Sequence, residues 1–498
     1  MAKYTPAGWT IISEGFMTEQ KKVKLIDVTL RDAHQCLWAT RMTTGMMKPI
    51  IENLDNAGFE AIDLVGGAVF DVCVRFLRED PWERMRIVSG WVKRTPLIVH
   101  HRGQSLFTFK YFADDVVALT AERIRANGIT YHTTYDALND VRNLEVPIRA
   151  AKQAGLYTSS GFVYTVSPVH TDEYYVRKIK EMVKLGADAI WLKDPSGLLT
   201  PERAATLVPA AKKACGELPL GVHTHCLSGL APYVLFRCAQ HGADVLHTAT
   251  SPLANGASHP ATESIVNNLR LAGIDVPLDL GNIEEAADKL RYIAWKEGKP
   301  TGEIRDYDEF HFHHQVPGGM ISNLKAQLAG MSMEHRLNEL LSEAARVRHD
   351  LGYPILVSPF AQYVATQAFL NITSQNRYDV VADEIRQYVL GFFGEVPGKI
   401  EPNLFDKLSR GKEPVTGRTG SYIEPQIPSA RKRRGRSVSD DDLLLSIFYD
   451  DREYNALKAA GPINTDYVIG NSPLGALSKG LSERPWIRSF GITAKSES

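Results

Sequence analysis

Two histidines separated by one residue, His223 and His225, carry the strongest chemical signal in the sequence. Residues two apart on a β-strand point the same way, so both imidazoles of the segment PLGVHTH would face one side. Two imidazoles on one face can bind one divalent cation. The same pair could also be hydrogen-bonded polar residues at the mouth of a loop, so a metal site requires further ligands.

Polar residues at the ends of other apolar runs offer such ligands. Asp32 follows KLIDVT and adds a carboxylate, and a set of nitrogens and oxygens suits zinc, manganese or cobalt. Lys193 ends DAIWLKD, where a lysine can form a Schiff base, act as a general base, become a carbamate with CO₂ or simply pair with Asp194. Three further side chains could hold a carboxylate or an enolate oxygen: Arg31, Gln35 and Arg102. Each of the two arginines could equally form an ion pair that closes the barrel.

An alternating pattern of strands and helices positions these residues. Eight short apolar or β-branched runs begin near residues 24, 59, 96, 129, 156, 188, 219 and 243. Helix-like segments lie between them, and the clearest of these end near a glycine, as helix C-caps do. The alternation indicates parallel strands joined by helical crossovers, and eight units predict a closed TIM (β/α)₈ barrel over residues 23–282. The catalytic site of such a barrel lies at the C-terminal ends of its strands, where the candidate residues fall.

The pattern changes after the predicted barrel. A 3.6-residue period predicts a helical second domain over residues 283–407. Residues 408–440, which include ARKRRGRS, are expected to form a basic solvated linker, although the basic run could contact an acidic partner. Residues 441–498 are predicted to be a helical tail, and residues 1–22 an N-terminal extension.

Composition narrows the class of protein. The 498 residues are 44% hydrophobic and 23% charged, which is ordinary for a globular protein of more than one domain. The formal net charge of -1 gives no reason to expect a nucleic acid or an anionic membrane as partner. No apolar run reaches the ~18 to 20 residues of a membrane helix, and the N-terminus lacks the features of a signal peptide. Five scattered cysteines without a CxxC pair argue against disulfides, so we expect a cytoplasmic protein.

The order of the motifs resembles the carboxyltransferase domain of biotin-dependent enzymes. That family includes pyruvate carboxylase, the alpha subunit of oxaloacetate decarboxylase and the keto-acid-binding subunit of transcarboxylase. The similar motifs run in order from about residue 23 to about residue 400: TLRDAHQCLWATRM, GGAVFD, LREDPWERMR, HRGQ, YDALNDVRN, VYTVSPVHT, LKDPSGLLTPE, HTH and VPGGMISNL. Within the family, the segment SPLANGASHPATES most resembles the transcarboxylase subunit.

The resemblance implies a complete metal site and a reaction. It implies that one divalent metal is bound by Asp32, Lys193, His223 and His225. It also implies that the lysine is N-carboxylated, which converts a cation into an anionic oxygen ligand. A keto acid then lies beside the metal, its enolate is stabilised by Arg102 and by groups near Gln35, and Arg31 completes the expected catalytic set. The metal acts as a Lewis acid, and carboxyl is exchanged with biotin on a separate carrier.

Several positions of the substrate pocket depart from the family pattern. A family tyrosine is Phe109 here, and an arginine of the fourth strand is Thr133. The threonine that relays a proton in pyruvate carboxylase is expected near Ala257 and Ser258. Other family residues, a tryptophan and two aspartates, are replaced at Val65, Cys226 and His247. Because lost hydrogen-bond donors weaken recognition of a polar substrate, these changes predict an acceptor other than pyruvate.

Three functions are compatible with these observations. The first is the carboxyltransferase subunit of a biotin-dependent carboxylase or transcarboxylase complex. The second is a biotin-independent decarboxylase or carbon–carbon lyase that uses the same enolate chemistry on a keto acid. The third is a non-catalytic assembly subunit, which the complete ligand set disfavours. No biotin-carrier motif or ATP-grasp pattern is visible, so we expect biotin carrier and biotin carboxylase subunits as partners of a homodimer of this chain.

Overall fold

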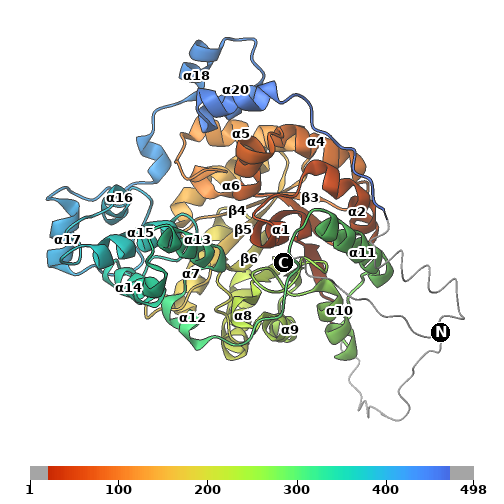
Figure 1. Cartoon of the computed structure of the whole chain (residues 1–498), viewed down its shortest axis with the longest axis horizontal. Coiled ribbons are helices and arrows are strands. Elements are labelled where there is room, and N and C mark those ends of the chain that lie inside the picture. The colour runs from red at the N-terminus through yellow and green to blue at the C-terminus, as the bar shows by residue number, and fades with distance from the viewer. Residues whose placement is uncertain (1–20, 471–498) are drawn as a thin grey trace, which may run out of the picture.

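The protein is described by a computed structural model that covers residues 21–470. The predicted N-terminal extension and the last part of the predicted tail lie outside these residues, apart from Lys21 and Lys22. Eight parallel strands close a barrel in sequence order (Figure 1), which confirms the TIM fold. The strands are β1 Lys24–Asp27, β2 Ala61–Val65, β3 Leu97–Arg102, β4 Tyr131–Tyr135, β5 Tyr157–Val163, β6 Ala189–Asp194, β7 Leu220–Thr224 and β8 Val245–Thr248.

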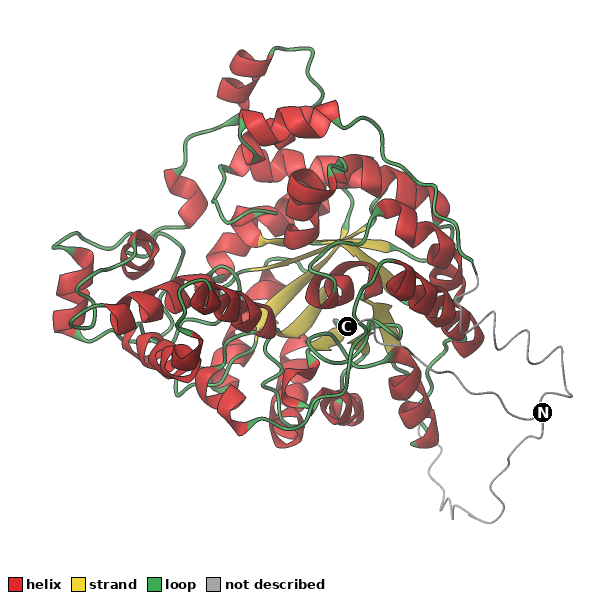
Figure 2. Ribbon diagram, in the orientation of Figure 1, coloured by secondary structure: helices red, strands yellow, loops and turns green. Residues whose placement is uncertain are grey.

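Helices surround the barrel and bury the outer faces of its strands (Figure 2), so that β2, β6 and β7 are buried along their whole length. Threonines cap three of these helices: Thr43, Thr171 and Thr200 each accept a hydrogen bond from a backbone N–H of the first turn. The ring consists of α2 Thr44–Asn56, α4 Pro81–Trp91, α5 Asp114–Ala126, α6 Glu145–Gln153, α7 Asp172–Lys184, α8 Pro201–Cys215, α9 Ala231–His241 and α10 Thr262–Leu271.

Short elements follow the strands at the C-terminal rim of the barrel. A π-helical turn, η1 Thr29–Ala33, and the short helix α1 His34–Leu37 follow β1. Helix α3 Gly67–Val72 and the π-helical turn η2 Cys73–Leu77 follow β2. These elements replace ordinary loops, so the polar residues predicted at the strand ends are held by backbone hydrogen bonds.

A helical second domain lies beside the barrel (Figure 1), as the 3.6-residue period predicts, and its core also includes Tyr135, Val163 and Trp191 of the barrel. Its main helices, α14 and α15, pack against each other. Helix α11, Leu280–Lys296, lies elsewhere: it packs on α2 and adds Ile283, Leu290 and Ile293 to the core of the barrel. The predicted boundary at residue 283 therefore falls inside a helix of the barrel. The second domain contains α12 Glu309–His314, α13 Gly318–Ala329, α14 Leu337–Asp350, α15 Phe360–Thr373, α16 Asp383–Val389 and α17 Pro402–Ser409.

The C-terminal helices α18 Ile427–Arg434, α19 Asp440–Phe448 and α20 Asp451–Ala459 return to the outside of the barrel near α5 (Figure 1). Phe448 of α19 packs on Phe70 and Phe107, whose rings stack with centroids 4.1 Å apart. The segment predicted as a solvated linker contains α18, and its Arg431 and Arg434 pair with acidic residues of the last two helices.

All five cysteines are free. Within residues 21–470, no helix is both long enough and apolar enough to cross a membrane.

Candidate metal centre

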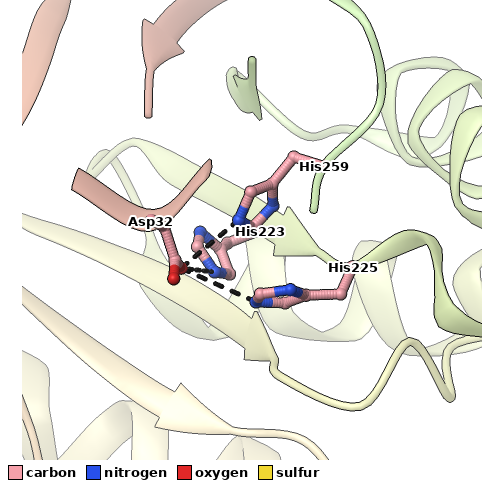
Figure 3. Close-up of side chains that lie close together, drawn as sticks. All are labelled: Asp32, His223, His225 and His259. Carbon is pink, nitrogen blue, oxygen red and sulfur yellow. Dashed lines mark ion pairs between the residues drawn. The ribbon is translucent and has the colours of Figure 1, made fainter. Parts of the chain in front are cut away.

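Four buried side chains meet at the rim of the barrel and form what we call the metal cluster: Asp32, His223, His225 and His259. Asp32 Oδ2 lies 3.1 Å from Nε2 of His223, 3.6 Å from Nε2 of His225 and 3.3 Å from Nε2 of His259 (Figure 3). The ligand atoms of all four residues lie within 4.8 Å of one another. One carboxylate oxygen thus faces three imidazole nitrogens at distances that a single metal ion could bridge.

The four residues of the cluster come from three parts of the chain: the turn after β1, the end of β7 and the loop after β8. Asp32 lies in η1, directly after β1, and His223 lies in β7. Thr224 turns to the opposite side and donates a hydrogen bond to Asp194, so His225 returns to the side of His223 as the HxH spacing predicts. His259 lies in the irregular loop between β8 and α10, within the motif SPLANGASHPATES. The sequence patterns did not identify it as a candidate ligand.

The hydrogen bonds of the Nδ1 atoms of His225 and His259 determine the tautomers of these two rings. Nδ1 of His225 lies 2.9 Å from the carbonyl oxygen of Ala257, and Nδ1 of His259 lies 3.0 Å from that of Thr224. A carbonyl oxygen only accepts, so in both rings Nδ1 carries the hydrogen and Nε2 presents its lone pair to Asp32. Burial lowers the pKa of His259 to about 4, in keeping with a neutral ring.

Lone pairs of neutral imidazoles that face a carboxylate oxygen repel one another unless a cation lies between them. His223 Nε2 and His259 Nε2 are buried and have no hydrogen-bond partner among the described residues. Buried polar atoms without partners are costly, and a divalent cation would satisfy both of them. The donor set of nitrogens and oxygen therefore fits the zinc, manganese or cobalt ion that the sequence analysis expected.

Arg31 holds the carboxylate of the cluster in its ionised form. Its Nη1 lies 2.8 Å from Asp32 Oδ2 and its Nη2 lies 2.6 Å from Asp63 Oδ2. Burial works against ionisation of Asp32, but the guanidinium of Arg31 holds the pKa of this carboxyl well below its usual value. A Cβ atom at Gly66 would lie 2.8 Å from Cδ of Arg31, so the first of the paired glycines makes room for this side chain.

Lys193 is buried beside the cluster. In the barrel it is the register partner of His223, and its Nζ lies 5.3 Å from the ring centre of Tyr135 and 5.2 Å from that of Trp191. Burial lowers the pKa of Lys193 to about 8. The carboxylate of Asp194 instead accepts hydrogen bonds from two backbone N–H groups and a threonine hydroxyl. No ion pair joins Lys193 to Asp194. The alternative in which this lysine simply pairs with Asp194 is therefore wrong.

A second group of predicted residues, which we call the acceptor side, consists of Arg102, Phe109 and Thr133 from β3, the segment after it and β4. Arg102 Nη2 donates to the carbonyl oxygen of Thr108 at 3.0 Å, and its guanidinium lies 4.8 Å from the ring centre of Phe109. A Cβ atom at Gly67 would lie 2.7 Å from Nη1 of Arg102. The second of the paired glycines therefore makes room for Arg102, as the first does for Arg31.

Two other positions predicted to bind substrate lie on neighbouring elements. Thr133 Oγ1 lies 3.2 Å from Nδ1 of His100, inside the barrel wall. Gln35 is half-buried on α1, three residues after Asp32. Neither position carries a positive charge, so Arg102 is the cation of the acceptor side.

The predicted relay positions lie next to the metal cluster. Ala257 contacts His225 through its backbone carbonyl, and its methyl side chain has no proton to transfer. The hydroxyl oxygen of Ser258 is buried without a hydrogen-bond partner among the described residues, while its backbone oxygen accepts from the N–H of Cys226 at 2.8 Å. Of the two, only Ser258 has the chemistry of a proton relay, and that role stays a prediction.

Comparison with known proteins places this site in a family. The family described as "HMGL-like" matches residues 22–290, and the "Conserved carboxylase domain" matches residues 312–470. A pyruvate carboxylase subunit from Methanocaldococcus jannaschii is 40% identical over 458 residues, which are 90% of this chain and 80% of that protein. The chain belongs to the carboxyltransferase family of biotin-dependent enzymes. This confirms the resemblance found in the sequence.

Other relatives in this carboxyltransferase family differ in name. The 2-oxoglutarate carboxylase large subunit of Hydrogenobacter thermophilus is 37% identical to this chain. The match covers 86% of this chain and 67% of that subunit. The methylmalonyl-CoA carboxyltransferase 5S subunit of Propionibacterium freudenreichii subsp. shermanii is 34% identical and covers 86% of each chain. Identity to the 5S subunit is thus lower than identity to the pyruvate carboxylase subunit, although the loop motif suggested the 5S subunit.

The fold agrees with a solved carboxyltransferase. The carboxyl transferase domain Y628A from Rhizobium etli pyruvate carboxylase, solved with pyruvate, superposes with a TM-score of 0.82 at 28% identity. The match covers 89% of this chain and 78% of that one. The barrel and the helical second domain are therefore the architecture of this carboxyltransferase.

Proposed function

We propose that this enzyme moves a carboxyl group between biotin on a separate carrier chain and an enolisable keto acid other than pyruvate, with a divalent metal in the metal cluster. The observation that carries the proposal is the convergence of Asp32 and three imidazole nitrogens at the catalytic rim of the barrel. In a carboxyltransferase, such a centre lies where negative charge develops on the substrate oxygen.

The residues of the chain divide this task. When bound, the metal supplies Lewis-acid stabilisation of the enolate oxygen. Arg31 keeps Asp32 anionic, and Arg102 offers a guanidinium for the carboxylate of the keto acid. Burial of the cluster excludes water and strengthens these electrostatic interactions.

Lys193 is proposed to be N-carboxylated and to complete the ligand set. A neutral amine adds to CO₂ with loss of one proton, and with a pKa of about 8 about a tenth of this amine is neutral at pH 7. The product is an anion beside His223, its register partner. We expect ¹³CO₂ to give a carbamate resonance in the purified protein that is absent from Lys193→Ala. A protein that binds metal fully without this resonance would contradict the modification.

The choice of keto acid is proposed from the acceptor side. Phe109 places an apolar ring on Arg102, and the hydroxyl of Thr133 is engaged with His100, so both positions lack the donors of the family pattern. Relatives of similar identity are named for different acceptors, and overall identity therefore does not decide the acceptor.

One assay tests the whole proposal. The purified full chain, loaded with zinc, manganese or cobalt, is mixed with a biotinylated carrier protein and a series of 2-keto acids, and carboxyl exchange is measured. We expect exchange that requires both metal and carrier and that is faster with another 2-keto acid of the series than with pyruvate. Fastest exchange with pyruvate would contradict the acceptor, and decarboxylation without carrier would favour a biotin-independent lyase. Metal loss that lowers stability while no reaction occurs would favour an assembly subunit.

The same proposal includes partner chains. The relatives named above as subunits support biotin carrier and biotin carboxylase subunits as partners, with this chain as a homodimer. We expect native mass measurement to give twice the chain mass, and the biotinylated carrier to co-purify with the enzyme. A monomer that retains no carrier would contradict both expectations.

A further inference from the structure

A fourth imidazole, that of His247 on β8, contacts the metal cluster through His223. Its Nδ1 lies 3.1 Å from Nδ1 of His223, and both side chains are buried. Two ring nitrogens at this distance form a hydrogen bond only when one carries the hydrogen and the other presents a lone pair. The direction of this hydrogen bond is therefore linked to the tautomer of His223.

The metal cluster fixes that direction. Nε2 of His223 lies 3.1 Å from Asp32 Oδ2 and is directed at the same oxygen as Nε2 of His225 and His259. To bind a cation, Nε2 of His223 must present its lone pair, so the hydrogen lies on Nδ1. His223 Nδ1 then donates to His247 Nδ1, and His247 carries its own hydrogen on Nε2.

The barrel interior holds the ring of His247 in place. Trp191 stacks on it with ring centres 5.6 Å apart and planes inclined by 12°. Trp191 is the register partner of Gly161 on β5 and of Gly221 on β7. A Cβ atom at Gly161 would lie 2.5 Å from Cε2 of the indole, and one at Gly221 would lie 3.2 Å from Cβ of Trp191. The two glycines thus make room for the indole that supports His247.

We infer that His247 is a positioning residue that holds His223 in the tautomer and orientation that bind the metal. This inference rests on the proposed metal function of the cluster. Metal-binding histidines commonly donate their second N–H to an acceptor that fixes the ring. Here the acceptor is a neutral imidazole stacked on Trp191, at the position where the family pattern has an aspartate.

Two substitutions of similar shape test the inference. Asn Oδ1 and Leu Cδ1 both lie two bonds from Cβ, as His Nδ1 does, so His247→Asn retains an acceptor at this place and His247→Leu removes it. Binding of Co²⁺ to the full metal-free chain is followed by the visible absorption of the ion. We expect His247→Leu to weaken binding about 10- to 100-fold and His247→Asn to bind within about threefold of the wild type.

A third substitution and a control distinguish loss of the acceptor from loss of packing or folding. In His247→Gln the amide oxygen is one bond further from Cβ, so we expect weaker binding than in His247→Asn even if the Leu variant does not fold. His100 also contacts Trp191, with ring centres 5.1 Å apart, but it bonds to Thr133 rather than to the cluster. His100→Asn is therefore expected to leave Co²⁺ affinity unchanged.

The outcomes separate this inference from the proposed function. Wild-type affinity in His247→Leu would overturn the role of His247. Equal weakening in His247→Asn, His247→Gln and His247→Leu would also overturn it, since the contact would then be one of packing only. Failure of the wild-type chain to bind Co²⁺, Zn²⁺ or Mn²⁺ would instead refute the metal centre itself.

Discussion

The two sides of the barrel mouth are built differently. On the side of β1, β7 and β8, the metal cluster is buried, and two of its imidazole nitrogens have no hydrogen-bond partner among the described residues. On the acceptor side, Phe109 is 56% exposed, and Arg102 and Thr133 already bond to groups of the protein. The metal side is thus an interdependent set, in which one change leaves several atoms unsatisfied. The side chains of the acceptor side can change one at a time, and under the proposed function this would let one metal centre serve different keto acids.

Asp32→Asn is expected to give the largest effect, because Asp32 Oδ2 is shared by three imidazoles and by Arg31. We expect loss of bound metal and a fall in carboxyl exchange on the order of 100- to 1,000-fold. Metal content by elemental mass spectrometry and the exchange rate are the measurements. Asp450→Asn, which retains a capping side chain at the start of α20, is the control and should behave as wild type. Full metal content in Asp32→Asn would show that the cluster is not the metal site.

His259→Ala tests the ligand that the sequence analysis missed. We expect the dissociation constant of the metal to rise about 10- to 100-fold, because one of three lone pairs directed at the centre is removed. Equilibrium dialysis against a competing chelator measures the change. His170→Ala removes another buried histidine, one that bonds to Ser167 rather than to the cluster, and should retain the metal. Equal affinities in both variants would mean that His259 is not a ligand.

Substitutions at the paired glycines test the metal side and the acceptor side one at a time, because Gly66 lies against Arg31 and Gly67 against Arg102. Gly66→Ala places a methyl group against Arg31, which two carboxylates hold, so we expect about 1–3 kcal/mol of destabilisation and reduced metal content. Gly67→Ala displaces the flexible end of Arg102, so KM for the keto acid should rise while metal content stays constant. Thermal unfolding, metal analysis and steady-state kinetics distinguish these results. If both variants lost metal equally, the two sides would not be independent.

Phe109→Tyr is expected to give the smallest effect. The ring is exposed above Arg102, so an added hydroxyl should change the free energy of unfolding by less than about 0.5 kcal/mol. The hydroxyl offers a new donor beside the guanidinium, and we expect a few-fold shift in the ratio of kcat/KM toward pyruvate. Phe392→Tyr, on another exposed phenylalanine, is the control. An unchanged ratio would remove Phe109 from the residues that select the acceptor.

Local patterns in the sequence account for the elements and for part of the site. Each of the eight predicted strands is present, because apolar runs bounded by helices need only neighbouring residues to be recognised. The HxH spacing placed His223 and His225 on one side for the same reason, since alternation along a strand is a local property. Asp32 was predicted because it closely follows an apolar run that is recognisable as a strand from neighbouring residues alone.

Residues in irregular segments and distant contacts could not be found in this way. The side chain of His259 is directed by a loop without a period, and His247 meets His223 only because β7 and β8 are neighbours in a closed barrel. The docking of α11 and of the C-terminal helices on the barrel likewise depends on apolar surfaces far apart in the chain.

The sequence by itself determined the barrel, the helical second domain, the family and three of the four residues of the metal cluster, because periodicity and motif order are properties of neighbouring residues. Only the tertiary structure decided that a third histidine joins the cluster, that Arg31 serves the metal side and Arg102 the acceptor side, and that two glycines make room for them. These features depend on distances between side chains from different strands, and closure of the barrel sets those distances.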